Sequence, residues 1–340
     1  MNKKLLALAV AGACVAPTAM AQTANPVTLY GRIYLTVENV EADAAGTTAA
    51  LPKRTRMQDQ ASYLGVRGTE DLGGGLKAFF QLETAFNPDD GSGTFANRNS
   101  GVGLQGGWGS VLLGRWDTPM KSAMTAVDPY GDLTAGDITG AALDQGNFSR
   151  RNGNLVQYWS PNMGGFAVKL AYMPDEGRTN PTATTAGAKP TLTSASLTYS
   201  KGALYLAGAY EEHKDQAGTT ATGGAKEEGI ALAARIALGN LRLMGHYGKY
   251  KKSVPGQAPI AKDKSYMVGA DYAMGKHVIL GSYQNAEWGS NDCDMYSIGY
   301  RYDFSKRTFF IASYTEVDNT GAMNCNFGTG SFGSAGQDLT

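Results

Sequence analysis

Three histidines and two cysteines are the side chains outside the N-terminal twenty residues that could support nucleophilic or metal chemistry. The histidines are His213, His246 and His277, and no Gly-x-Ser-x-Gly motif accompanies them. His246 shares a polar face with Arg242, so a polar lining explains it without catalysis. We therefore expect no enzyme, and a Ser–His hydrolase carried on a barrel is the enzymatic alternative.

Cys293 and Cys325 occur without a Cys-x-x-Cys or His-x-x-His motif, so the sequence predicts no metal site and no cofactor. In an exported protein, two cysteines favour a disulfide. Cys293 lies at the loop end of one expected strand, and Cys325 lies in the loop after the next. Adjacent antiparallel strands would bring both to one rim, which predicts a disulfide between them, with two free thiols as the alternative.

Export is indicated by residues 1–21, which we expect to be a cleaved signal peptide. Lys3 and Lys4 precede an apolar run over 5–15, and Ala19 and Ala21 frame a small-x-small cleavage site. That run is too short for a membrane helix. Residues 22–340 then carry 28 basic and 30 acidic side chains, a net charge of −2 that gives no indication of nucleic-acid binding.

The elements that must position these side chains are strands. Over residues 27–38, Val27, Leu29 and Ile33 share one face, while Tyr30 and Arg32 share the other. A period of two marks a strand with one apolar and one polar side. Similar alternation recurs over 62–67, 76–83, 166–172, 194–199, 204–210, 230–238, 241–247, 266–273, 278–283, 296–302 and 309–315.

Connections between these strands alternate in length. Short turns at 71–75, 200–202 and 274–276 alternate with longer segments such as 117–147 and 174–192. Short turns on one rim and long loops on the other are typical of an outer-membrane barrel. Charges interleaved with apolar residues favour the same polarity, apolar outside and polar inside. The predicted fold class is therefore all-β, a transmembrane antiparallel β-barrel.

Five motifs give the chain its resemblance to a known family. They are TLYG at 28–31, LGVRGTEDLGGGLKAFFQLE at 64–83, GSVLLGR at 109–115, DPYG at 128–131 and YWSPNMGGF at 158–166. In these runs the chain resembles the general porins of Gram-negative bacteria, especially the β-proteobacterial type, over essentially all of residues 22–340.

The resemblance implies a 16-stranded barrel in the outer membrane, assembled as a homotrimer among outer-membrane lipid and lipopolysaccharide. It implies passive passage of ions and small hydrophilic solutes through a water-filled channel. It also implies that the third long loop, here 117–147, folds into the lumen. An adhesin or receptor, in which the barrel only anchors binding loops, is the alternative function.

A constriction follows from that loop as a hypothesis. The loop carries acids and one opposing Lys121, and the facing strands carry basic residues on their polar side. The family alignment adds Arg98 and Arg151, although parity with Val102 and Leu104 would turn Arg98 outward. A basic side opposite an acidic loop would produce an electric field across the pore and set its ion selectivity. Whether anions or cations are preferred stays open. In the alternative, several of these charges are simply solvated at a rim or a loop tip. The acids are Asp117, Asp128, Asp132, Asp137 and Asp144, and the basic residues are Arg32, Arg67, Lys77, Arg98 and Arg151.

Arg115 follows the parity of Val111 and Leu113, which directs it outside the barrel. Because a charge facing lipid is costly, we expect either a subunit interface or a rim position. The loop 87–97 corresponds to the family's latch onto a neighbouring barrel. Fifteen strand-like segments can be traced, and we expect the closing strand of the family to be missing from this chain.

Overall fold

The computed structural model describes residues 27–131, 134–141, 148–180, 187–216, 224–255, 263–327, 332 and 336–340. Antiparallel strands dominate them, as the all-β prediction requires. Asp132, Asp144 and the expected signal peptide lie outside the described residues. Within the described part of the chain, no helix is long and apolar enough to cross a membrane.

One 16-stranded antiparallel sheet forms the molecule, with its strands almost entirely in chain order. Its first part comprises β1 (Val27–Arg32), β4 (Tyr63–Gly73), β5 (Leu76–Asn87), β7 (Ser100–Gly106), β8 (Gly109–Asp117) and β9 (Arg151–Trp159). Short β6 (Ser92–Thr94) pairs with β5 beside this path, and β2 (Leu35–Ala42) pairs with β3 (Leu51–Asp59) as a separate hairpin.

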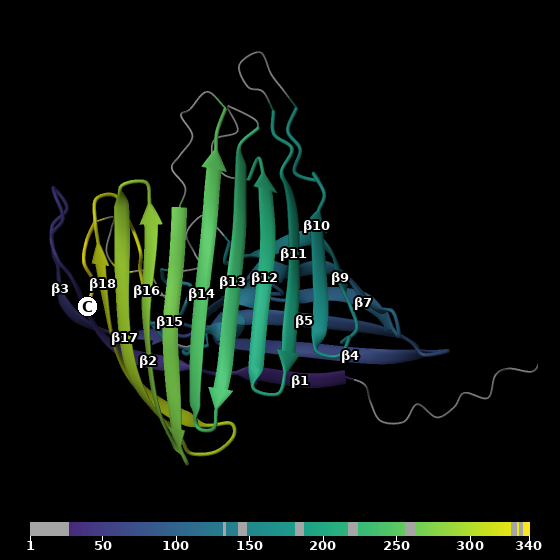
Figure 1. The fold of residues 1–340 in the computed structure, drawn as a ribbon, viewed down its shortest axis with the longest axis horizontal. Helices are drawn as coiled ribbons and strands as arrows, with labels where there is room; N and C mark the ends of the chain where they lie inside the picture. Colours follow the sequence, from purple (N-terminus) through teal and green to yellow (C-terminus); the bar gives the residue numbers. More distant parts are fainter. Residues whose placement is uncertain are drawn as a thin grey trace, which may run out of the picture.

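The second part continues the meander with longer strands. They are β10 (Phe166–Met173), β11 (Thr191–Lys201), β12 (Leu204–Lys214), β13 (Lys226–Leu238), β14 (Leu241–Ser253), β15 (Asp263–Met274), β16 (His277–Trp288), β17 (Asn291–Asp303) and β18 (Phe309–Asn319). The sheet curves so that β1, β4 and β5 cross behind the upright strands β10–β15 (Figure 1).

Side chains alternate between the two faces as the sequence predicts. On β13, Ile230 and Leu232 are exposed, whereas Ala231 and Ala233 are buried. The outer face carries a continuous band of exposed Leu, Ile, Val and Tyr side chains along nearly every strand. Such a band would be a liability in water and is suited to lipid.

The two rims differ in their connections. At one rim, tight turns join the strands, and Gly239 and Gly275 adopt the left-handed conformation there, with φ of 63° and 64°. A side chain with a Cβ is strained in that conformation, so glycine permits the tightest connection. The other rim carries the long segments, including 118–150, which agrees with the predicted alternation.

The segment 118–150 begins with a short helix, α2 (Pro119–Met124), followed by η1 (Thr125–Val127). Thr118 caps α2 because its hydroxyl accepts from the Lys121 N–H, and Pro119 suits the first helical turn. Met120 and Met124 are fully buried in a core cluster that includes Tyr205 of β12. The helix is therefore held by packing against strands and not by its own length.

The first and last strands are not hydrogen-bonded to each other within the described residues. Instead, Leu339 forms bridges to Ala42 of β2 and to Val317 of β18. Beside this junction the predicted disulfide between Cys293 and Cys325 is present, with a Cα–Cα distance of 6.3 Å.

Candidate functional site

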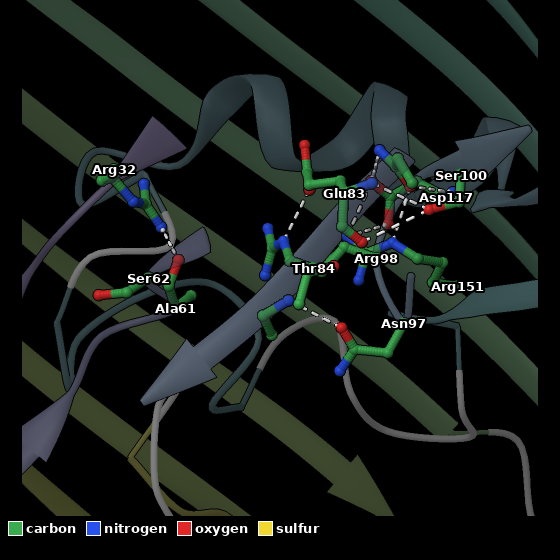
Figure 2. A network of polar contacts seen from close by, with 12 residues as sticks. Arg32, Ala61, Ser62, Glu83, Thr84, Asn97, Arg98, Ser100, Asp117 and Arg151 are labelled. Atoms are coloured by element: carbon green, nitrogen blue, oxygen red, sulfur yellow. Dashed lines mark hydrogen bonds and ion pairs between the residues drawn. The ribbon is translucent and has the colours of Figure 1, made fainter. Parts of the chain in front are cut away.

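Two arginines predicted for the basic side lie on the polar face of the first strands. The Arg32 Nη2 donates to the backbone carbonyls of Gln60 and Ala61, at 3.3 and 3.0 Å (Figure 2). Its guanidinium lies 5.5 Å from the centre of the Tyr63 ring. The Arg67 guanidinium lies 5.0 Å from the Tyr30 ring and is exposed.

Arg98 joins the same group through a carboxylate. Its Nε lies 2.7 Å from Glu83 Oε1 (Figure 2). Its guanidinium lies 5.0 Å from the centre of the Tyr63 ring. The Tyr30 hydroxyl donates to the other oxygen of Glu83 at 3.0 Å. Strand β7 begins only at Ser100, so the parity of Val102 and Leu104 does not govern Arg98. We refer to Arg32, Arg67 and Arg98 as the arginine wall.

Glu83 and Tyr30 are functional candidates that the sequence reasoning did not single out. Glu83 is only 7% exposed and links Tyr30 to Arg98. The strand alternation could have indicated Glu83, because it places Glu83 on the same polar face as Lys77. Parity places a side chain on a face, but it does not identify the partner on the neighbouring loop.

Lys77 is exposed but does not join this group. In the strand register it lies opposite Asp71, four residues along β4 from Arg67. A second lysine on the polar side, Lys169 of β10, lies 5.5 Å from the Trp159 ring. Lys77 and Lys169 therefore add basic charge to other strands of the polar face.

Arg151 and Asp117 form a pair at the start of the segment 118–150. The Arg151 Nη2 lies 3.1 Å from Asp117 Oδ1, and its Nε donates to Asn99 Oδ1 at 2.7 Å (Figure 2). Lys121 lies 3.2 Å from the same carboxylate. A register shift between β8 and β9, with Asn154 at a positive φ of 55°, interrupts the parity expected for Arg151.

The two other described aspartates of the segment contact their own loop. Asp128 accepts from the Tyr130 N–H at 2.9 Å, and Asp137 accepts from the backbone N–H of Thr139 at 2.7 Å and from its hydroxyl. Asp137 is fully buried. Burial, with the charge of Asp128, raises the pKa of Tyr130 above its usual range, so this phenol stays neutral.

Wall side chains from distant strands bind the backbone of this segment. The Tyr205 hydroxyl donates to Ala123 O at 2.9 Å, and Arg235 Nη1 donates to Ala126 O at 2.7 Å. Gln284 Nε2 donates to the carbonyls of Gly136 and Asp137 at 3.0 and 2.9 Å. We refer to β11–β16, whose inner face this segment contacts, as the covered wall.

The covered wall ends in a buried polar cluster around His213. Its Nε2 lies 2.7 Å from Glu211 Oε1, and its Nδ1 lies 3.3 Å from Glu227 Oε2. Phe148 stacks between His213 and Tyr250, with ring centres 4.8 Å from each. The carboxylates of Glu211 and Glu227 are buried. Because Phe148 packs on this cluster, the cluster holds the end of the segment 118–150.

The other histidines give no accessible nucleophilic site. His246 Nε2 lies 3.4 Å from the hydroxyl of Ser265, but both residues are buried. His277 Nδ1 lies 2.7 Å from the Tyr300 hydroxyl at the short-turn rim. Across the described segments, no group of three His, Cys, Asp or Glu side chains is arranged to hold a metal ion.

This curved sheet, apolar outside and lined with arginines inside, has counterparts among known proteins. Residues 7–322 match the Gram-negative porin family. The chain belongs to that family. Its outer-membrane location follows, and porins are channels and not enzymes.

Relatives of this porin cover nearly all of its length. It is 34% identical to outer membrane porin protein 32 of Delftia acidovorans, over 95% of this chain and 91% of that protein. It is 30% identical to the major outer membrane protein P.IB of Neisseria meningitidis serogroup B, over 92% of each. The solved structure of an anion-selective porin from Comamonas acidovorans matches with a TM-score of 0.79 and 27% identity, over 93% and 97% of the two chains.

A more distant structure supports the fold alone. The trimer form of OmpT from Vibrio cholerae matches with a TM-score of 0.69 at 16% identity, over 93% of this porin and 97% of that chain. The Delftia, Neisseria and Comamonas matches agree with the β-proteobacterial type that the motifs predict.

The candidate interface residue Arg115 is exposed. Its Nε donates to Asn97 O at 2.7 Å, so it contacts the end of the loop 87–97. The two segments that the sequence associates with a neighbouring subunit are therefore joined to each other in this porin.

Proposed function

We propose that this porin forms a water-filled channel for passive diffusion of ions and small hydrophilic solutes. The exposed outer band suits lipid, and the polar inner face suits water. In this proposal the segment 118–150 narrows the lumen from the covered wall. Its hydrogen bonds to Tyr205, Arg235 and Gln284 support that role, because they tie it to inward-facing side chains.

We propose further that the channel prefers anions, with the arginine wall as the element that sets selectivity. The carrying observation is the exposed guanidinium of Arg67 over the Tyr30 ring. Of the acids proposed to oppose it, Asp117 is paired with Arg151 and Lys121. Asp128 and Asp137 accept hydrogen bonds from their own loop. A solved relative is titled an anion-selective porin, which is consistent with this sign.

The assembly belongs to the proposal as well. A signal peptide over 1–21 would direct export, and three copies would associate through the face that carries Arg115 and the loop 87–97. The remaining outer band would then contact outer-membrane lipid and lipopolysaccharide. A trimer would cover Arg115, which removes the cost of exposing its charge to lipid.

Planar-bilayer recording tests the proposal. A channel gives stepwise and persistent currents after insertion, with three conductance levels for a trimer. Silent insertion would contradict the channel and favour a barrel that only anchors its loops.

A further inference from the structure

The outer face of β12–β15 is hollowed at the depth of the apolar band. A groove of about 640 Å³ lies there, and its floor is formed by the small residues Gly208, Ala234 and Gly245. Larger apolar side chains border it, among them Leu232, Tyr247, Tyr266 and Val268. Strands β12–β15, which carry it, are drawn upright in Figure 1.

A group of lysines stands directly above this groove. In the strand register, Lys249 pairs with Lys264, while Tyr247, two residues before Lys249 on β14, pairs with Tyr266. Lys251 is the next outward residue on β14 toward the long-loop rim. The row of lysines therefore begins one outward position beyond the aromatic edge of the groove.

Carboxylates neutralise only part of this positive charge. Lys226 pairs with Glu212 and Glu228, at 2.7 and 2.8 Å, and Lys264 pairs with Glu287 at 2.8 Å. Among the described residues, Lys249 and Lys251 form no ion pair, and both are exposed; Glu228, opposite Lys251 in the strand register, pairs with Lys226 instead. Lys249 lies over the Tyr247 ring at 5.8 Å, which keeps its ammonium close to the groove.

The combination identifies a ligand class. Two outward side chains at positions i and i+2 of a strand stand about 7 Å apart, a separation that a phosphate group can bridge. The groove below offers apolar contact along its length, where an acyl chain would lie. Lysines at a membrane rim commonly extend toward lipid headgroups. Lys249 and Lys251 differ from an ordinary rim lysine because an apolar groove lies next to them.

We propose that this face binds an anionic lipid of the outer leaflet, with its phosphate across Lys249 and Lys251 and one acyl chain over Gly208 and Gly245. The inference rests on the proposed outer-membrane channel and takes its long-loop rim as the one that faces outward from the cell. It goes beyond the channel, because the site lies on the lipid-facing side of the wall and not in the lumen.

The test measures lipid retained by the full-length, folded protein in native mass spectrometry, with bis-phosphorylated lipid A as the probe. The double variant Lys249→Gln/Lys251→Gln removes the charge, and we expect about a fivefold loss of binding per lysine. Gly245→Leu fills the groove and should also weaken binding. A Cβ at Gly245 meets nothing closer than 3.7 Å, so the fold tolerates the change; Gly208→Leu, with 3.5 Å, is the second groove variant.

Lys201→Gln provides the matched control, because Lys201 is exposed on the same wall at the opposite rim. It should retain lipid A as the unaltered chain does. Equal retention by the double lysine variant would overturn the site, and so would retention by both groove variants. Full displacement by millimolar inorganic phosphate would also overturn it, because the acyl chain would then contribute nothing.

Conductance of the same preparations separates this inference from the proposed function. Lost lipid binding with unchanged currents supports the lipid site as an independent feature. Absence of current from the unaltered chain would refute the channel whatever the lipid result.

Discussion

The arginine wall and the covered wall both carry polar side chains on the inner face of the sheet, but these side chains have different partners. On the covered wall, Tyr205, Arg235 and Gln284 bind the backbone of the segment 118–150; Tyr205 and Gln284 are buried and Arg235 is partly buried. On the arginine wall, aromatic rings and one carboxylate hold the guanidinium groups, and Arg67 stays exposed. The same polar parity therefore yields structural anchors where a loop lies over the strands and solvent-facing charge where it does not.

The strongest way to break this contrast is to loosen the covered wall. Met124→Ala removes a fully buried side chain between α2 and the strands. Large-to-small core changes of this kind cost about 2–5 kcal/mol. We expect faster hydrogen exchange across 119–127 and noisier single-channel currents.

Arg67→Ala is the matched change on the other side. It should leave hydrogen exchange of 119–127 unaltered, because Arg67 forms no hydrogen bond or ion pair with the described residues of the segment. Equal loosening by both variants would show that the two sides are not mechanically distinct.

Removal of the disulfide tests how the C-terminal region holds the segment 118–150. Cys293 and Cys325 are separated by 32 residues, and the N–H of the next residue, Asn326, donates to Gly140 O of the loop. Closing a loop of this length contributes about 3–4 kcal/mol in the chain-entropy description. The Cys293→Ala/Cys325→Ala variant should unfold at a lower temperature, and an unchanged midpoint would contradict a structural role.

The sequence predicts part of the difference between the covered wall and the arginine wall. The strands and their faces were predictable, because a period of two on strands such as β13 needs no knowledge of neighbours. The position of Arg98 was not, because it precedes β7 and its direction depends on Glu83. The roles of Asp128 and Asp137 also depend on the backbone of a loop, where no periodicity applies.

A single charge on the arginine wall should change ion selectivity without changing stability. Arg67→Ala removes the exposed guanidinium, and we expect the anion-to-cation permeability ratio to fall by at most about fivefold, since one charge at 4 Å in water contributes roughly 1 kcal/mol. Arg67→Lys keeps the charge and should keep most of the ratio. Reversal potentials in a salt gradient measure both variants, and an equal fall in the lysine variant would argue against charge as the cause.

The smallest expected effect has the opposite sign. Glu83→Gln removes the carboxylate that pairs with Arg98 and accepts from Tyr30. The net positive charge of the wall should rise, and the permeability ratio should increase by less than Arg67→Ala decreases it. A shift toward cations would mean that Glu83 matters by positioning Arg98 and not by neutralising it.

The central claim is that the arginine wall, and not the acids of the loop, sets selectivity. The most direct test compares reversal potentials of the unaltered chain and the Arg32→Ala/Arg67→Ala/Arg98→Ala variant across a KCl gradient. We predict an anion-selective potential for the unaltered chain and its loss or inversion in the triple variant. A cation-selective potential in the unaltered chain, or the same potential in both, would contradict the account.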